Sequence, residues 1–230
     1  MSTTSVIGGG LVAGSSSVPN PRQDGPTVLV AAVGEAEGAR GAAAALACAG
    51  ADLDTPALFV DVGGRAPRPA LLASAAAQKL EERLGAHSPD LRAAARGQVC
   101  HLCVPAKPEG LEAAAAAVTV ARGSTAVLHL PPALLQPAVC GTPGLRPSGV
   151  LLRANLVEDR PLVALAARDL LARGCAVAVL KRRLSWVAER RALFGALPSG
   201  SPGGLPKRVA RRLGIPSRDT EFPAGAAGMG

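Results

Sequence analysis

Aromatic residues are almost missing from this chain of 230 residues, which has one Trp, three Phe and no Tyr. A core without aromatic side chains must be built from Ala, Val and Leu. These side chains bury less apolar area each, but they let a helix approach a sheet closely. The chain is still long enough to form one large domain or two small ones around a substantial core.

Long apolar runs are also missing, since no stretch reaches the ~18 residues that a membrane-spanning helix requires. Residues 1–17 have neither a basic segment nor a sustained apolar run, so we expect no signal peptide. The five cysteines are odd in number and irregularly spaced, which is not typical of a disulfide framework. We therefore expect a cytoplasmic protein with reduced thiols.

Acidic residues are outnumbered by basic ones, 17 to 25, which gives a net charge of +8 and a pI near 10.1. Such an excess indicates either an anionic partner or only an arginine-rich composition, and the sequence leaves both open. The basic residues of the C-terminal third gather at 181–183, 190–191, 207–208 and 211–212.

Short apolar runs alternate with longer helical segments along the middle of the chain. We expect strands at 28–33, 57–62, 98–104, 125–130, 149–152 and 175–180, and helices at 41–49, 69–84, 109–121, 160–173 and 185–197. This order predicts a three-layer, doubly wound α/β domain: a mostly parallel sheet of about six or seven strands with helices on both faces. We place it at residues 27–198, between a flexible leader at 1–26 and a basic Pro/Gly-rich tail at 199–230.

The stretch from Thr27 to Gly64 has the pattern of a phosphate-binding segment. An apolar run is followed by a loop that contains Gly34 and Gly38, an alanine-rich helix, and a second apolar run that ends in Asp61-Val62-Gly63-Gly64. A buried strand that leads through a glycine loop into a helix places backbone N–H groups where they can bind phosphate. Ligands of parallel sheets bind at the carboxyl ends of the strands, where the loop, Asp61 and His129 are expected to meet.

Three motifs in this order resemble those of the ParA/MinD family of P-loop ATPases. The window Glu37-Gly38-Ala39-Arg40-Gly41-Ala42-Ala43 matches K-G-G-x-G-K-S/T, and Asp61 resembles the Asp that often ends the family's second strand. In A-V-L-H-L-P-P, His129 occupies the Asp position of the family's D-x-P-P motif. The resemblance implies a nucleotide-binding edge, and it places these residues there: Gly34, Gly38, Arg40, Gly41, Asp61 and His129.

The departures from the family motifs remove most of the chemistry. Ala42 occupies the position of the phosphate-binding lysine, Ala43 that of the magnesium-binding hydroxyl, and Glu37 that of the signature lysine. Phosphoryl transfer depends on charge neutralisation and positioning, which these residues cannot supply. We therefore expect a pseudo-ATPase without catalytic residues, cofactor or metal. The alternative is a nucleotide-binding enzyme that binds ATP through backbone amides, Arg40 and Asp61.

For such a pseudo-ATPase, the resemblance implies a role in protein interaction or localisation, of the kind found in secretion, pilus assembly or polar positioning. Its partner would be an ATPase relative or a secretion component, and a homodimer is open. A weak contact of the basic C-terminal segment with an anionic membrane or DNA is an alternative function.

Cys100-His101-Leu102-Cys103 contains a C-x-x-C motif inside an expected strand. Alternation along a strand puts Cys100 and Cys103 on opposite faces, and no second pair supplies the remaining zinc ligands. We interpret both as core cysteines. His129 is expected to be a hydrogen-bonded structural histidine, and Asp61 either a group of the ligand edge or a helix N-cap.

Overall fold

A computed structural model of the chain describes residues 25–34, 38–51, 54–64, 72–88, 91, 93–154, 159–180 and 213–215. Its elements follow one another as β1 (Thr27–Ala32), α1 (Ala39–Gly50), β2 (Ala57–Val62), α2 (Ala75–His87), β3 (Ala93–Arg96), β4 (Val99–Val104), α3 (Pro108–Val120), β5 (Ala126–Leu130), α4 (Pro132–Cys140), β6 (Gly149–Arg153), α5 (Arg160–Ala172) and β7 (Ala176–Leu180).

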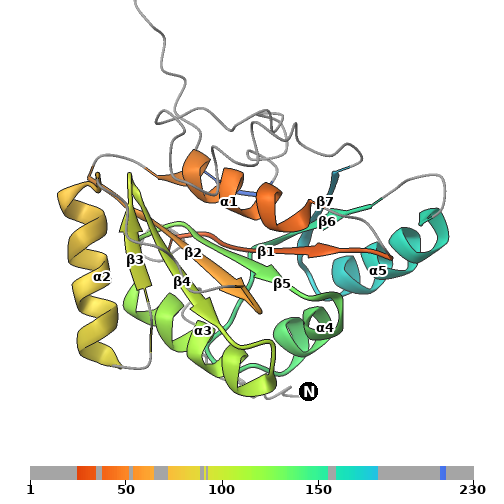
Figure 1. Ribbon diagram of the computed structural model, residues 1–230. Coiled ribbons are helices and arrows are strands. Elements are labelled where there is room, and N and C mark those ends of the chain that lie inside the picture. The colour runs from red at the N-terminus through yellow and green to blue at the C-terminus, as the bar shows by residue number, and fades with distance from the viewer. Residues whose placement is uncertain are drawn as a thin grey trace, which may run out of the picture.

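The strands form one seven-stranded sheet in the order β3-β4-β2-β5-β1-β6-β7 (Figure 1). Every neighbouring pair is parallel except β3 and β4, so the antiparallel strand lies at an edge. The predicted α/β class with a mostly parallel sheet is confirmed. Strand β5 lies between β1 and β2, so the ends of these three strands meet at the same edge.

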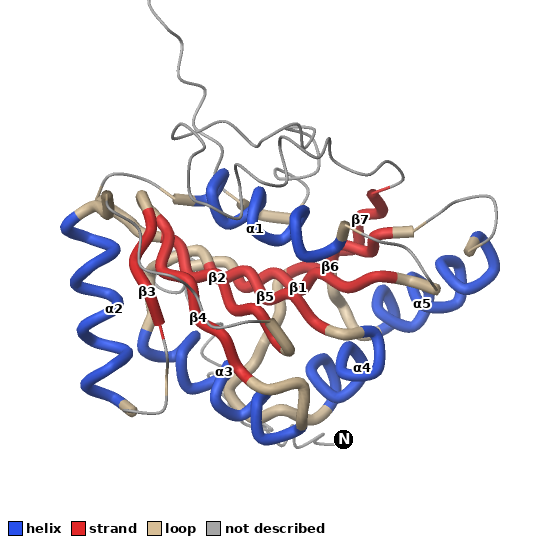
Figure 2. Tube along the Cα trace, viewed as in Figure 1, coloured by secondary structure: helices blue, strands red, loops and turns tan. Residues whose placement is uncertain are grey.

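Helices cover both faces of the sheet, as Figure 2 shows. Helix α1 packs against β1, β2 and β5 on one face, whereas α2, α3, α4 and α5 contribute to the core on the other face. Nearly all of α1 is buried, including Ala42 and Ala43 at 0% exposure. Its small side chains let the whole helix lie close to the strands, which is how this core forms with so few aromatic residues.

Two elements were not predicted. The segment Ala93–Arg96 is too short and alanine-rich to be distinguished as a strand by its pattern, and it forms only by pairing with β4. We interpreted Pro131-Pro132 only as the end of a strand, but Pro132 begins α4, where the missing N–H of a proline costs nothing.

The helix predicted at 69–84 starts later than expected, at Ala75. Ser74 is its N-cap, and the Ser74 side chain accepts a hydrogen bond of 3.2 Å from the backbone N–H of Ala77. The same helix ends at His87, three residues later than expected. The boundaries of the other predicted elements that the structure describes agree to within about two residues, which is the usual uncertainty of helix and strand ends.

Part of the predicted tail belongs to the core. Leu213 and Ile215 are 1% and 2% exposed and pack into the α1 side of the sheet. A Cβ on Gly149 would lie 2.9 Å from Leu213, so β6 and this segment are in close contact. Leu213 and Ile215 are therefore part of the core although they lie within the predicted tail, and Gly214 between them is exposed. The leader up to residue 24, the helix 185–197 and the basic clusters of the C-terminal third lie outside the described residues.

None of the helices in the described ranges is both long and apolar enough to cross a membrane.

Gly85 offers a simple test of the helical assignment of α2. It is exposed inside the helix, and a Cβ built on it meets nothing within 4 Å. We expect Gly85→Ala to raise the free energy of unfolding by about 1 kcal/mol, because alanine restricts the unfolded chain and favours helix. Urea denaturation followed by circular dichroism measures this change. A lower unfolding midpoint would contradict the assignment.

Candidate functional site

Asp61 is the centre of a polar cluster at the carboxyl ends of the strands. In the sheet register Asp61 lies between Cys103 of β4 and His129 of β5. Phe59, two residues before Asp61 in β2, is paired with His101 of β4. Phe59 faces α1, and residues two apart in a strand share a face, so Asp61 faces α1 as well. The same alternation places His101, Cys103 and His129 beside it.

The carboxylate of Asp61 is 0% exposed and is surrounded by cationic or potentially cationic groups. Arg40, in the first turn of α1, donates from Nε to Oδ2 at 2.5 Å. His129 Nδ1 lies 2.9 Å from Oδ1, within hydrogen-bonding distance, and His101 Nε2 lies 3.8 Å from Oδ2. A buried carboxylate is stable only with such partners, because its desolvation is costly.

These partners determine the protonation of Asp61. Burial alone would raise the pKa of its carboxyl group. The nearby imidazole of His101, the hydrogen bond with His129 and the positive charge of Arg40 together outweigh burial and hold the pKa well below its usual range. Asp61 is therefore a carboxylate at neutral pH, with Arg40 as its charge partner.

Two neighbours keep the side chains in place. The ring of His101 stacks on Phe59, with ring centroids 4.7 Å apart. Gly64 follows the strand and leaves room for the carboxylate, since a Cβ on Gly64 would lie 2.0 Å from Asp61 Oδ2. A glycine is needed here for space, because the backbone of Gly64 does not have a positive φ.

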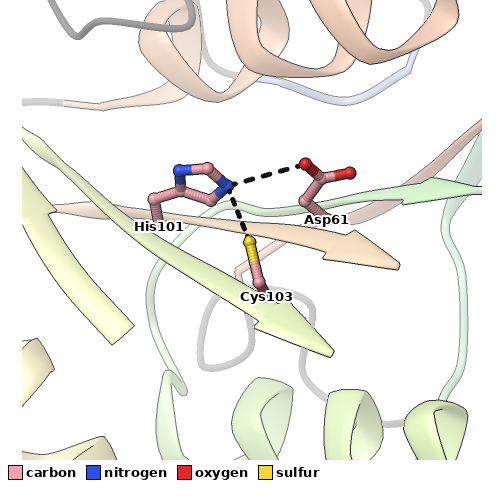
Figure 3. A group of neighbouring side chains, drawn as sticks. All are labelled: Asp61, His101 and Cys103. Carbon is pink, nitrogen blue, oxygen red and sulfur yellow. Dashed lines mark hydrogen bonds and ion pairs between the residues drawn. The ribbon is translucent and has the colours of Figure 1, made fainter. Parts of the chain in front are cut away.

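Cys103 completes the cluster. Its Sγ lies 3.5 Å from Nε2 of His101, the same nitrogen that faces Asp61, as Figure 3 shows. One ligand atom from each of Asp61, His101 and Cys103 lies within 4.8 Å of the other two. The three side chains therefore direct an oxygen, a nitrogen and a sulfur atom toward one point.

This geometry does not fit a nucleophilic triad. In a triad the two ring nitrogens of histidine separate the nucleophile from the acid, whereas here sulfur and carboxylate face the same nitrogen. Burial and the nearby charge of Asp61 also raise the pKa of the Cys103 thiol to about 11, so it is protonated at neutral pH. The cluster can hold a positive charge, but it cannot generate a thiolate nucleophile by itself.

The interpretation of the C-x-x-C motif was right for one cysteine and wrong for the other. Cys100 faces the opposite core and is 0% exposed, and burial raises the pKa of its thiol to about 12. Cys103 is half-buried and belongs to the polar cluster. His101 and Cys103 were missed as site residues. Their spacing of two residues in a strand, together with Asp61 at the end of the preceding strand, was the available signal.

The predicted site residues divide into two groups. Arg40, Asp61 and His129 are brought together by direct contacts, whereas the three glycines have backbone roles. Gly38 precedes α1 with φ of 89°, Gly41 is buried within α1, and Gly34 has φ of 61°. A Cβ on Gly34 would lie 2.3 Å from Asp159 Oδ1.

The phosphate-binding role of these glycines stays a prediction. Ala42 and Ala43, at the positions of the family's lysine and hydroxyl, are packed against the sheet at 0% exposure. Glu35 and Glu37 lie outside the described residues. Comparison of the chain with protein families, with curated proteins and with solved structures finds no match.

Proposed function

We propose that this protein is a non-hydrolysing, ParA/MinD-like domain that acts through protein interaction or localisation. The observation that carries the proposal is the contact of Arg40 with Asp61 at the edge where the resemblance places the nucleotide. Arg40 is the one cation in the glycine window, and its charge is already balanced by a buried carboxylate. A triphosphate would therefore have to compete with Asp61 for it.

The packing of α1 supports the same proposal. Residues 42 and 43 are completely buried, so no side chain at these positions reaches toward a phosphate or a magnesium ion. Asp61 is the next-to-last residue of the second strand, close to where the resemblance leads one to expect an Asp, but its carboxylate is enclosed by Arg40 and His129. A role in protein interaction requires the fold but requires no catalytic side chain at residues 42, 43 and 61.

Exposed leucines on α5 support the interaction part of the proposal. Leu162 and Leu165 are 52% and 59% exposed, and both line a groove of about 650 Å³ between α4 and α5. Large apolar side chains grouped on one surface are typical of protein contacts.

Calorimetry of the purified protein with ATP and ADP, with and without magnesium, tests the proposal. We expect no binding heat and no rise in melting temperature at millimolar nucleotide, because a ligand specific for the folded state must raise that temperature. Arg40→Ala should leave this result unchanged. Micromolar binding that Arg40→Ala abolishes would instead establish a working phosphate site and refute the pseudo-ATPase.

A further inference from the structure

We propose that Asp61, His101 and Cys103 form a binding site for a single transition-metal ion, with Zn²⁺ as the best match. Figure 3 shows the three side chains, which lie on the α1 side of the sheet near Arg40 in the first turn of that helix, and the site is independent of the outcome with nucleotides. Its ligands would be Oδ2 of Asp61, Nε2 of His101 and Sγ of Cys103. Carboxylate, imidazole and thiolate are the ligands that Zn²⁺ takes in proteins, whereas Mg²⁺ and Ca²⁺ prefer oxygen alone.

The separation of the sulfur and nitrogen atoms agrees with a tetrahedral ion. Zinc–nitrogen and zinc–sulfur bonds of their usual lengths place the two ligand atoms about 3.5 Å apart. Sγ of Cys103 and Nε2 of His101 are separated by 3.5 Å. Asp61 Oδ2 lies 3.8 Å from the same nitrogen, so a small shift of the carboxylate closes the site. Three protein ligands leave one position for water or another small ligand.

The surroundings already hold two of the three ligands in place. His129 occupies Oδ1 of Asp61 through its Nδ1, which leaves Oδ2 as the oxygen that faces the site. Phe59 stacks on the His101 ring and fixes its plane. Outer contacts of this kind orient metal ligands and contribute to affinity.

The guanidinium of Arg40 would compete with the metal ion for the carboxylate of Asp61. Its Nε contacts the same oxygen, Oδ2, that the metal would bind, but its side chain is 39% exposed and can turn into solvent. The exchange balances in charge. Cys103 loses its thiol proton to water on binding, and a divalent ion is then neutralised by one thiolate and one carboxylate while the guanidinium becomes solvated.

Titration of the full chain with Zn²⁺ in the calorimeter, in a non-thiol reductant, tests this proposal. Absorption with Co²⁺ as the probe adds a thiolate-to-cobalt band that reports Cys103 directly. We expect one ion per chain, and a loss of affinity of at least about 100-fold in Cys103→Ser and His101→Gln. Arg40→Ala should bind Zn²⁺ more tightly than the unchanged protein, because the cation that competes for Oδ2 is gone.

Two matched controls use residues of the same type outside the cluster. Cys140→Ser and His87→Gln change an exposed cysteine and an exposed histidine and should bind as the unchanged protein does. Cys103→Ser is nearly isosteric at a half-buried position, so it decides the question even if His101→Gln does not fold. Absence of Zn²⁺ binding and of the cobalt band, or undiminished binding by Cys103→Ser, would overturn the proposal.

Discussion

Asp61→Asn is expected to lower the free energy of unfolding at pH 7 by about 2–3 kcal/mol, since hydrogen bonds to charged groups contribute about 1.5–3 kcal/mol each. Asparagine keeps the shape of the side chain but removes the charge that pairs with Arg40. Arg40 is 39% exposed and can be solvated after the change, so the cost stays below that of stranding a fully buried charge.

The same variant should change the response to acid. The pKa of Asp61 is lowered in the folded state from the ordinary 3.8, so the unfolded chain takes up this proton first as the pH falls. The stabilisation by Asp61 is therefore complete above its unfolded pKa and declines from about pH 5 downward. The difference in the free energy of unfolding between the unchanged protein and Asp61→Asn should become smaller as the pH falls below about 5.

Urea unfolding from pH 7 to pH 3 in the presence of a chelator measures both effects. Asp169→Asn is the matched control, because Asp169 of α5 forms an exposed ion pair with Arg173, the residue that follows the helix. It should cost less than about 0.5 kcal/mol, as exposed pairs in helices do. Equal effects of the two substitutions would show that the Asp61 contacts do not stabilise the fold.

Gly64→Ala should be destabilising by about 2–3 kcal/mol, although a methyl group is the only addition. The new Cβ would lie 2.0 Å from Asp61 Oδ2, and the short, buried carboxylate cannot move without losing contact with Arg40 or His129. The same displacement should weaken the proposed zinc site. Gly85→Ala is the matched substitution at a position with free space, and its effect should have the opposite sign.

A double-mutant cycle with Asp61→Ala shows whether the carboxylate carries the effect. In the Asp61→Ala background the clashing atoms are absent, so Gly64→Ala should be nearly neutral. If urea denaturation shows that the losses in free energy of unfolding from Gly64→Ala and Asp61→Ala simply add, the strain lies elsewhere in the turn. That result would contradict the crowding of Asp61.

Local pattern was sufficient to predict most of the fold. The second strand, Ala57–Val62, was predicted at its observed ends because an apolar run is bounded there by turn residues. Two elements were missed. The edge strand Ala93–Arg96 depends on pairing with a partner strand, and the helix at Pro132 was missed because proline was taken only as the end of a strand and not as the first residue of a helix.

The candidate site shows a similar division. Strand alternation correctly separated Cys100 from Cys103, and the motif analysis placed Asp61 and His129 at one edge. It could not reveal that Cys103 is the register partner of Asp61, because pairing across strands depends on which strands become neighbours. Leu213 was assigned to the tail because it follows a Pro/Gly-rich segment far from the predicted domain. Its position along the chain does not show that it packs into the core.

The sequence by itself determined the α/β class, the parallel sheet and the absence of the lysine and hydroxyl from the glycine window, because each is a property of neighbouring residues. Only the tertiary structure decided what the polar residues do. Arg40, Asp61, His129 and the pair His101 and Cys103 are distant from one another in the chain, and the order β4-β2-β5 beneath α1 brings them together. The buried carboxylate of Asp61 is then stabilised by the groups that the fold places beside it, because a charge removed from water must be neutralised.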